Sequence, residues 1–342
     1  MKKKIRIIVD AMGGDFAPHN EVEGGLLALQ ASKSNDINLD IIYIGDSSKI
    51  EPIVSSSSLY DEFSEHITIV AAKEIVAMHD DPIQALKTKK ESSMVKGIQL
   101  LKDGGADGYI SAGNTGATLT IATMILGRIE GVSRPTIGAF LPTSQKKPVL
   151  LLDVGATIDC HSRYLFEYAI MGSIYSKAIQ GIDKPSIGLL NVGEEDTKGG
   201  AERVDAYKQL QESSMNFFGN VEGGDVLLGK TDVVVTDGFS GNCILKFAEG
   251  FPKMFAELIP QYVCKSSDRG TDMNVVVPVL KDMLSGLNAE EYGGVPLLGV
   301  KGTVIIGHGN STPRTIMMMI FSAVTAIEKE VDKKIEAELK KK

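Results

Sequence analysis

The sequence has 342 residues, enough for one large or two ordinary α/β domains with a full hydrophobic core. A hydrophobic fraction of 43% and a net charge of −8, with no basic stripe, are typical of a soluble globular protein and argue against a general nucleic-acid binder. Three widely spaced cysteines, an apolar start too short for a signal peptide and the lack of an apolar run of about 18 residues predict a cytoplasmic chain without a disulfide framework or membrane span.

The first predicted element is a buried strand that runs into a glycine turn. Residues 5–9 form a nearly continuous apolar run, as in parallel strands covered on both faces. Asp10 ends this run, Gly13 and Gly14 follow, and a helix begins near Pro18. Ligands in open α/β sheets bind at the carboxyl ends of strands, so Asp10 is a candidate site residue. An ordinary turn-forming aspartate explains it equally well.

Strands are then predicted over 39–44 and 67–70, with a short helix over 48–54 between them. The stretch 75–94 begins as a loop and becomes helical. Its Lys87 and Lys89 could reach a bound anion, although a run of charges is usually a solvated face.

The segment GYISAGNTGA, residues 108–117, combines the end of a buried strand, a turn of small polar residues and the start of a helix. A helix start offers free backbone N–H groups and the positive end of the helix dipole, which suits an anion. We therefore interpret the turn as a phosphate cradle. An ordinary βα loop is the alternative, because the segment has neither a Walker lysine nor the dinucleotide fingerprint. The candidate ligands are Ser111, Asn114, Thr115 and Gly116.

The same strand, polar loop and helix pattern recurs over 148–157, 187–200, 231–247 and 302–312, while 131–143 is expected as a loop. Alternating βα units predict a mainly parallel sheet with right-handed crossovers and helices on both faces. Because the carboxyl ends of parallel strands share one edge, the polar residues there should line a single cleft. These residues are Asp10, Ser111, Asp153, Asn191, Asp237 and His308.

Residues 248–288 depart from this pattern and are expected to form a helical hairpin that projects from the α/β body. Its apolar face could pack on a partner subunit, lie on a membrane surface or pack on its own domain. The remainder is predicted as one catalytic domain over 1–335, with two subdomains around one cleft as a variant, and a frayed basic tail over 336–342. The first hairpin helix carries Phe251, Met254, Phe255, Leu258, Ile259 and Tyr262 on one face.

Over roughly residues 5–330 the chain resembles the PlsX phosphate acyltransferases, on the motifs DAMGGDFAP, SAGNTGA, LLDVGATIDC, NVGEEDTKG, GNVEGGD, VVVTDGFSGNCILK and GGVPLLGVKGTVIIGHG. The resemblance implies transfer of a fatty acyl group from acyl carrier protein to inorganic phosphate, giving acyl phosphate for phospholipid synthesis. It also implies a homodimer, peripheral membrane association, a three-layer fold like that of isocitrate and isopropylmalate dehydrogenases, and a glycerol-3-phosphate acyltransferase downstream. Thr157, Lys87 and Ser240 stand where the family commonly has Asn, Arg and Thr.

This reaction needs orientation and oxyanion donors more than acid–base groups, because phosphate dianion is already a nucleophile and a thiolate is a tolerable leaving group. No cofactor or metal is expected. We expect Gly13, Gly14, Ser111, Asn114, Thr115, Gly116 and Lys87 to bind phosphate, Asn191, Lys198, Asp237, Asn242, Lys246 and His308 to act in catalysis, and Asp10 and Asp153 to orient donors.

Three other functions fit parts of the sequence. A decarboxylating dehydrogenase of the related fold would need an aspartate cluster for metal, which Asp237 and its neighbours match only partly. The hairpin also fits a non-catalytic membrane-recruited scaffold, and the loops fit a short-chain phosphotransacetylase that uses coenzyme A. A covalent mechanism through Cys160 and His161 is disfavoured, because adjacent residues at a helix start point in different directions.

Overall fold

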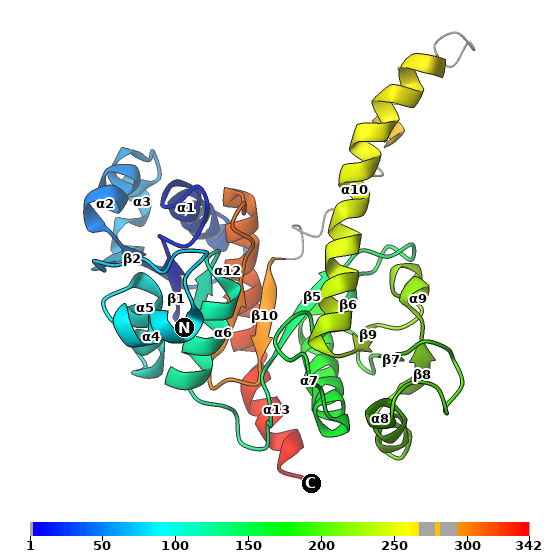
Figure 1. The fold of residues 1–342 in the computed structure, drawn as a ribbon. Helices are drawn as coiled ribbons and strands as arrows, with labels where there is room; N and C mark the ends of the chain where they lie inside the picture. Colours follow the sequence, from blue (N-terminus) through cyan, green and yellow to red (C-terminus); the bar gives the residue numbers. More distant parts are fainter. Residues whose placement is uncertain (1–2, 267–277, 281–292, 342) are drawn as a thin grey trace. The chain divides into compact units, whose positions relative to one another are not determined.

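The computed structural model describes residues 3–266, 278–280 and 293–341. The chain divides into two compact units. Unit 1 comprises Met1–Gly138, Ser173–Asp183 and Glu290–Lys342, and unit 2 comprises Ala139–Gly172 and Lys184–Ala289. The predicted α/β architecture is confirmed, since each unit holds a largely parallel sheet with helices (Figure 1).

The unit 1 sheet has the strand order β3-β2-β1-β4-β11-β10-β5. Neighbouring strands from β3 to β11 are parallel, whereas β10 runs antiparallel to both β11 and β5. Val9 pairs with Ile110, and Ile110 with Ile305, so β1, β4 and β11 end at one edge. The strands are β1 (Ile5–Asp10), β2 (Leu39–Gly45), β3 (Ile67–Ala71), β4 (Gly108–Ser111), β5 (Thr136–Leu141, which belongs to unit 1 up to Gly138 and to unit 2 from Ala139), β10 (Val295–Leu298) and β11 (Thr303–Ile306).

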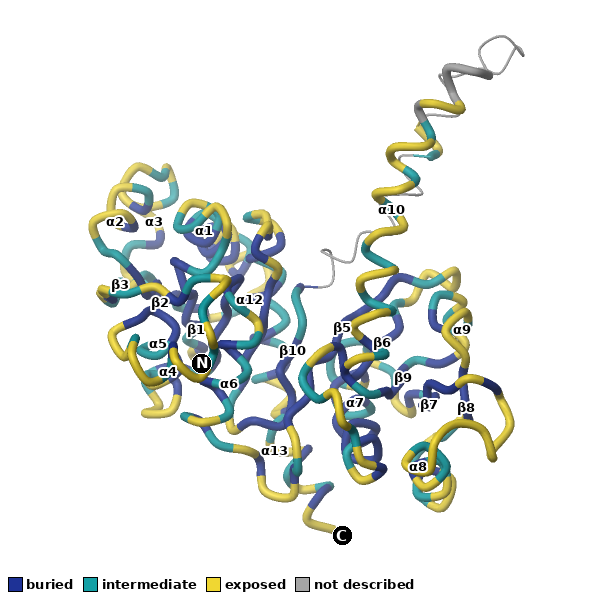
Figure 2. Tube along the Cα trace, in the orientation of Figure 1, coloured by how far each residue is buried: buried dark blue, intermediate teal, exposed yellow. Residues whose placement is uncertain are grey.

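Helices cover both faces of this sheet. On one face, a Cβ placed on Gly24 of α1 would lie 2.5 Å from the Ile316 Cβ of α12. On the other face, a Cβ on Gly97 of α5 would lie 2.6 Å from the Tyr109 ring. The strands between them are buried, as Figure 2 shows. The helices are α1 (His19–Ser34), α2 (Ser47–Ser56), α3 (Tyr60–Phe63), α4 (Pro82–Thr88), α5 (Ser93–Lys102), α6 (Thr115–Ile125), α12 (Pro313–Glu328) and α13 (Val331–Leu339), with a 3-10 turn, η1 (Ser64–His66).

Two sequence expectations are corrected in this unit. The segment 131–143 contains the buried strand β5, because its Thr-Ile-Gly-Ala-Phe-Leu run is apolar enough to sit inside the sheet. The tail is helical as far as Leu339, since Ile335 and Leu339 of α13 are buried and anchor the helix.

The unit 2 sheet has the order β6-β9-β7-β8, with all pairs parallel. Its first three strands are fully buried, which explains their unbroken apolar sequences. The strands are β6 (Val149–Leu152), β7 (Ile187–Leu190), β8 (Phe217–Val221) and β9 (Val233–Val235), and the helices are α8 (Ala201–Gln211), α9 (Gly223–Leu228) and α10 (Gly238–Ser266). Helix α7 (Ser162–Gln180) belongs to unit 2 up to Gly172 and to unit 1 from Ser173.

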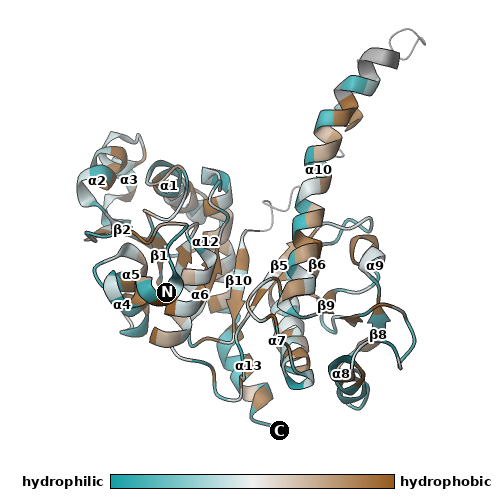
Figure 3. Ribbon diagram, viewed as in Figure 1, coloured by the Kyte–Doolittle hydropathy of each residue, from teal (hydrophilic) through white to brown (hydrophobic). Residues whose placement is uncertain are grey.

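Helix α10 is continuous over 29 residues, so the helix that follows β9 and the first expected hairpin arm are one element. Phe251, Met254, Leu258 and Tyr262 are exposed along it, among hydrophilic residues (Figure 3). Most of the second arm lies outside the described residues, so the hairpin stays a prediction. Among the described helices, none is long and apolar enough to cross a bilayer.

Candidate functional site

In unit 1, a buried carboxylate ties together the ends of β1 and β4. Asp10 is 1% exposed, and its Oδ2 accepts hydrogen bonds from Ser111 Oγ at 2.8 Å and Tyr109 Oη at 3.1 Å. Burial raises the pKa of Asp10, although these hydrogen bonds oppose the rise. Asp10 therefore orients the end of β4, and the Ser111 hydroxyl is already used as a donor to Asp10.

The glycines of the loop after β1 are required by contact between loops. A Cβ placed on Gly13 would lie 2.8 Å from the Gly113 amide nitrogen, so the two backbones touch. The Asp15 amide donates to the Gly309 carbonyl at 2.7 Å. The loops after β1, β4 and β11 therefore form one continuous surface at the edge of unit 1.

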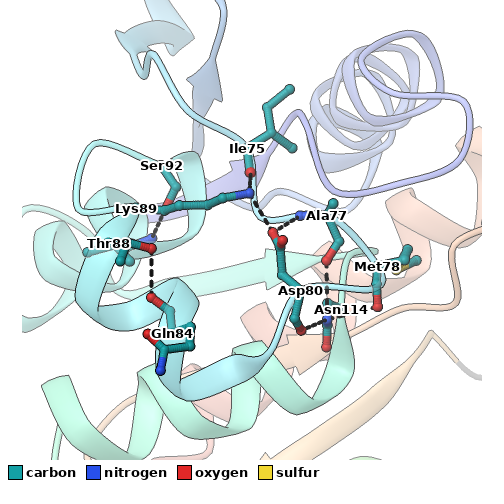
Figure 4. A network of polar contacts seen from close by, with 10 residues as sticks. Ile75, Ala77, Met78, Asp80, Gln84, Thr88, Lys89, Ser92 and Asn114 are labelled. Carbon is teal, nitrogen blue, oxygen red and sulfur yellow. Dashed lines mark hydrogen bonds and ion pairs between the residues drawn. The ribbon is translucent and has the colours of Figure 1, made fainter.

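Asn114 holds the turn before α6 in shape. Its Oδ1 accepts from the Ala117 amide at 3.0 Å, which caps α6. Its Nδ2 lies 3.2, 3.0 and 3.2 Å from the carbonyl oxygens of Ala77, Met78 and Asp80 (Figure 4). The side-chain amide is thus engaged within the protein, and any part it plays in anion binding is through the backbone it arranges.

The groups left to meet an anion here are backbone amides. Thr115 and Gly116 occupy the first two positions of α6, where N–H groups have no intrahelical acceptor. Thr115 is exposed and Gly116 is half-buried. The turn therefore presents donors and the positive end of a helix dipole to solvent.

Of the two lysines expected to reach an anion, Lys89 is held beside this turn by contacts within the protein. Lys89 Nζ contacts Asp80 Oδ2 at 2.6 Å and the Ile75 carbonyl at 2.9 Å (Figure 4). This bond from Lys89, with the Ala77 amide, lowers the pKa of Asp80. Lys87 is exposed at the end of α4, and its role in phosphate binding stays a prediction.

His308 follows β11 on the edge that also carries Asp10 and Ser111. Its ring is exposed, and its Nδ1 accepts a long bond, 3.4 Å, from the Asn310 amide. A ring that accepts at Nδ1 carries its proton on Nε2, which leaves a donor for a ligand.

In unit 2, Asp153 plays the part that Asp10 plays in unit 1. It is fully buried, and its carboxylate accepts from the amides of Gly155, Ala156 and Thr157 at 3.2, 3.0 and 2.7 Å. A Cβ on Gly241 would lie 1.8 Å from the Asp153 carbonyl, so the start of α10 packs tightly on this loop.

Asp237 forms an ion pair with Arg203 that the sequence did not reveal. Arg203 Nη2 donates to Asp237 Oδ2, and Ser240 donates through its amide and hydroxyl, each at 2.8 Å. Burial opposes ionisation, yet the Ser240 hydrogen bonds and the Arg203 charge outweigh it and lower the pKa of Asp237. The available signal was an arginine in the first turn of a helix, where a cation opposes the dipole and so needs an acidic partner.

The other predicted residues of unit 2 differ in how firmly they are held. Asn191 is buried, and its side chain bonds the Val192 amide and the Lys198 carbonyl, each at 2.9 Å, closing the loop after β7. Lys246 is exposed and pairs with Glu249 at 2.8 Å. Lys198 and Asn242 are exposed, and a Cβ on Gly155 would lie 3.1 Å from Asn242 Nδ2.

Cys160 is not poised as a nucleophile. Burial, helped by the charges of Asp153 and Asp237, raises the pKa of the Cys160 thiol to about 12. The neighbouring His161 ring pairs with Glu202 at 3.3 Å. Among the described residues, no group of three or more His, Cys, Asp or Glu is arranged to hold a metal ion.

The structure therefore gathers the predicted residues into two groups. Unit 1 holds Asp10, Gly13, Gly14, Ser111, Asn114, Thr115, Gly116 and His308 at the ends of β1, β4 and β11, and unit 2 holds Asp153, Asn191, Lys198, Asp237 and Asn242 at the ends of β6, β7 and β9. Each group lies where parallel strands place ligand-binding loops.

Residues 5–334 match the model of a family described as "Fatty acid synthesis protein". The phosphate acyltransferase of a Nitratiruptor species is 41% identical over 335 residues, 98% of each chain. That of Acetivibrio thermocellus is 44% identical over 332 residues, 97% of this chain and 96% of the relative. A phosphotransacetylase from Streptococcus pyogenes has a similar fold, with a TM-score of 0.61 at 16% identity, covering 96% of this chain and 95% of its own.

Proposed function

The chain belongs to the fatty acid synthesis protein family, which confirms the predicted resemblance, and we propose that it is a phosphate acyltransferase. It takes a fatty acyl group from the thioester of acyl carrier protein and gives it to inorganic phosphate. The observation that carries this proposal is identity of 41–44% over nearly the whole chain to proteins named phosphate acyltransferase. The phosphotransacylase-like fold and a helix start with free amides support it.

In the proposed reaction, phosphate dianion binds at the amides of Thr115 and Gly116, where the α6 dipole favours negative charge. A phosphate oxygen attacks the thioester carbon, the carbonyl oxygen becomes an oxyanion, and the C–S bond breaks to release the thiolate, which then takes up a proton. Nε2 of His308 is a suitable donor for phosphate or oxyanion. No side-chain nucleophile is required, which agrees with the high pKa of the Cys160 thiol.

We assign the unit 2 group to the acyl thioester, and the single cleft expected from the sequence stays a prediction. The Arg203–Asp237 pair orients the loop ends, while Asn191, Asn242, Lys198 and Lys246 supply polar and positive groups. The support is that both groups follow the carboxyl ends of buried parallel strands, where open α/β sheets bind ligands.

The experiment supplies the purified protein with long-chain acyl carrier protein, with and without inorganic phosphate. Hydroxylamine-trapped acyl phosphate should appear only with phosphate, in step with free carrier thiol. Acetyl coenzyme A as the preferred donor would instead favour the short-chain phosphotransacetylase. Loss of the thioester without phosphate would contradict the proposal.

The homodimer, the peripheral membrane contact through 248–288 and the delivery of acyl phosphate to a glycerol-3-phosphate acyltransferase are further parts of the proposal. The support within the described residues is the exposed apolar side chains of α10, with Phe247 67% and Tyr262 67% exposed. Liposome flotation with and without Phe247→Ser and Tyr262→Ser separates membrane contact from dimerisation, which light scattering reports.

A further inference from the structure

Glu21 is a buried carboxylate next to Gly14, in the loop after β1 that contains Gly13 and Gly14, here called the glycine loop. It lies in the first turn of α1 and is 1% exposed. A Cβ placed on Gly14 would be 2.1 Å from Glu21 Oε1, so the carboxyl group occupies the space that a side chain at position 14 would need. Among the described residues, neither Glu21 oxygen has a hydrogen-bond partner of normal geometry.

The surroundings of Glu21 are unfavourable to its charged form. Burial, followed by the charges of Asp10 and Asp15, raises the pKa of Glu21 to about 7, although the amides of Glu21 and Gly14 oppose the rise. An ionised Glu21 therefore adds a further negative charge beside Asp10, below a loop predicted to bind an anion. The elements packed here carry further titratable or charged side chains. These are Arg6 of β1, His19, Glu23 and Lys33 of α1, Asp40 and Tyr43 of β2, His308 after β11, and Arg314 and Glu328 of α12.

We propose that Glu21 is a positioning residue for phosphate, and that the phosphate held at the Thr115 and Gly116 amides also contacts Gly13 and Gly14, whose loop touches Gly113, with Glu21 neutral. This rests on the proposed function only in placing phosphate at the unit 1 group. Because phosphate dianion and Glu21 carboxylate would repel each other across the thin Gly14 backbone, binding is coupled to proton uptake: the dianion and one proton enter, and the proton stays on Glu21.

The direct test is isothermal titration of the wild-type protein with inorganic phosphate at pH 8, in two buffers of different ionisation enthalpy. At this pH Glu21 is mostly ionised in the free protein, so we expect uptake of nearly one proton per phosphate bound. Phosphate binding without proton uptake would overturn this proposal alone, whereas no phosphate binding at all would contradict the proposed function as well. This readout needs neither a variant nor acyl transfer, so it separates failure here from failure of the proposed reaction.

Glu21→Gln provides the second test, with Glu23→Gln as the matched control, since Glu23 lies on the same helix, carries the same charge and is 46% exposed. Between pH 7 and pH 8 the wild-type dissociation constant, calculated per phosphate dianion, should rise about fivefold as the neutral fraction of Glu21 falls. The Glu23→Gln protein should show the same rise. In Glu21→Gln the rise should vanish. Since phosphate itself titrates identically for all three proteins, an equal rise in Glu21→Gln would refute the coupling.

Discussion

At the scale of single residues, buried polar side chains in this protein shape loops more than they present themselves to solvent. Asp10 and Asp153 are almost inaccessible, and each holds the first residues of the loop that follows its strand. Such carboxylates serve catalysis by fixing where backbone amides point. Asn114 does the same for the turn before α6.

Substitutions of Asn114 separate its role as the α6 cap from its role as a hydrogen-bond donor to Ala77, Met78 and Asp80. Asn114→Ala removes the α6 cap and the bonds to Ala77, Met78 and Asp80, so it should destabilise the protein by about 2 kcal/mol and raise the KM for phosphate. Asn114→Asp retains the cap acceptor but loses the donors. Urea unfolding and phosphate-dependent kinetics measure both. Unchanged stability in Asn114→Ala would contradict the structural role.

The charge state of Glu21 should also govern stability. Its folded pKa lies above the unfolded value of 4.5, so its stabilising effect is complete below pH 4.5 and is lost as the pH rises towards 7. Glu21→Gln should therefore gain up to about 3 kcal/mol relative to wild type between pH 5 and pH 8. Urea unfolding of both proteins at the two pH values measures this. An equal pH dependence in both would show that Glu21 does not titrate in this range.

For the Arg203–Asp237 pair we expect the opposite dependence of stability on pH. The side chains of Arg203 and Asp237 are 28% and 13% exposed, and the pKa of Asp237 is lowered, so its contribution exists above pH 3.8 and is lost at lower pH. A double-mutant cycle with Arg203→Met and Asp237→Asn should give a coupling free energy of about 1–3 kcal/mol at pH 7. Additive effects of the two changes would mean that the pair contributes nothing.

At the scale of elements, the loops are positioned by contacts between backbones. Gly13 and Gly113 come from turns about 100 residues apart in sequence, and they touch without side chains between them. Gly241 likewise lets the first turn of α10 reach the end of β6. From the sequence, we interpret the glycines of the loop after β1 as anion-binding residues. They are also needed because the loop backbones of this chain pack directly against each other.

Alanine substitution tests this packing. Gly13→Ala would place a methyl group 2.8 Å from the Gly113 nitrogen, so it should destabilise the protein by about 1–3 kcal/mol. Gly250→Ala, in α10 with no atom within 4 Å of the added Cβ, should instead stabilise by roughly 0.5–1 kcal/mol. Thermal unfolding compares them. A neutral Gly13→Ala would show that the two loops separate readily.

At the scale of the whole molecule, the proposed mechanism requires both units to act on one acyl thioester and one phosphate. Hydrogen exchange tests this requirement. Acyl carrier protein with a stable thioester analogue, together with phosphate, should slow exchange both in residues 111–117 of unit 1 and in residues 191–200 of unit 2. Protection confined to one unit would contradict a shared cleft.

The sequence by itself determined the succession of strand, polar loop and helix, because buried parallel strands need unbroken apolar runs and βα turns need glycine and capping residues. It also identified Asp10, Ser111, Asp153, Asn191, Asp237 and His308 as strand-end residues, since position along the chain alone defines a strand end. It did not indicate β5, because a short apolar run between Pro135 and Pro142 resembles a loop.

Only the tertiary structure decided what these side chains do. The Asn114 donors are engaged by carbonyls 34 to 37 residues away, and Arg203 reaches Asp237 across 34 residues. The burial of Glu21 follows from the packing of α1 and the glycine loop. Hydrogen bonds and desolvation depend on neighbours in space, and local sequence patterns carry no record of those neighbours.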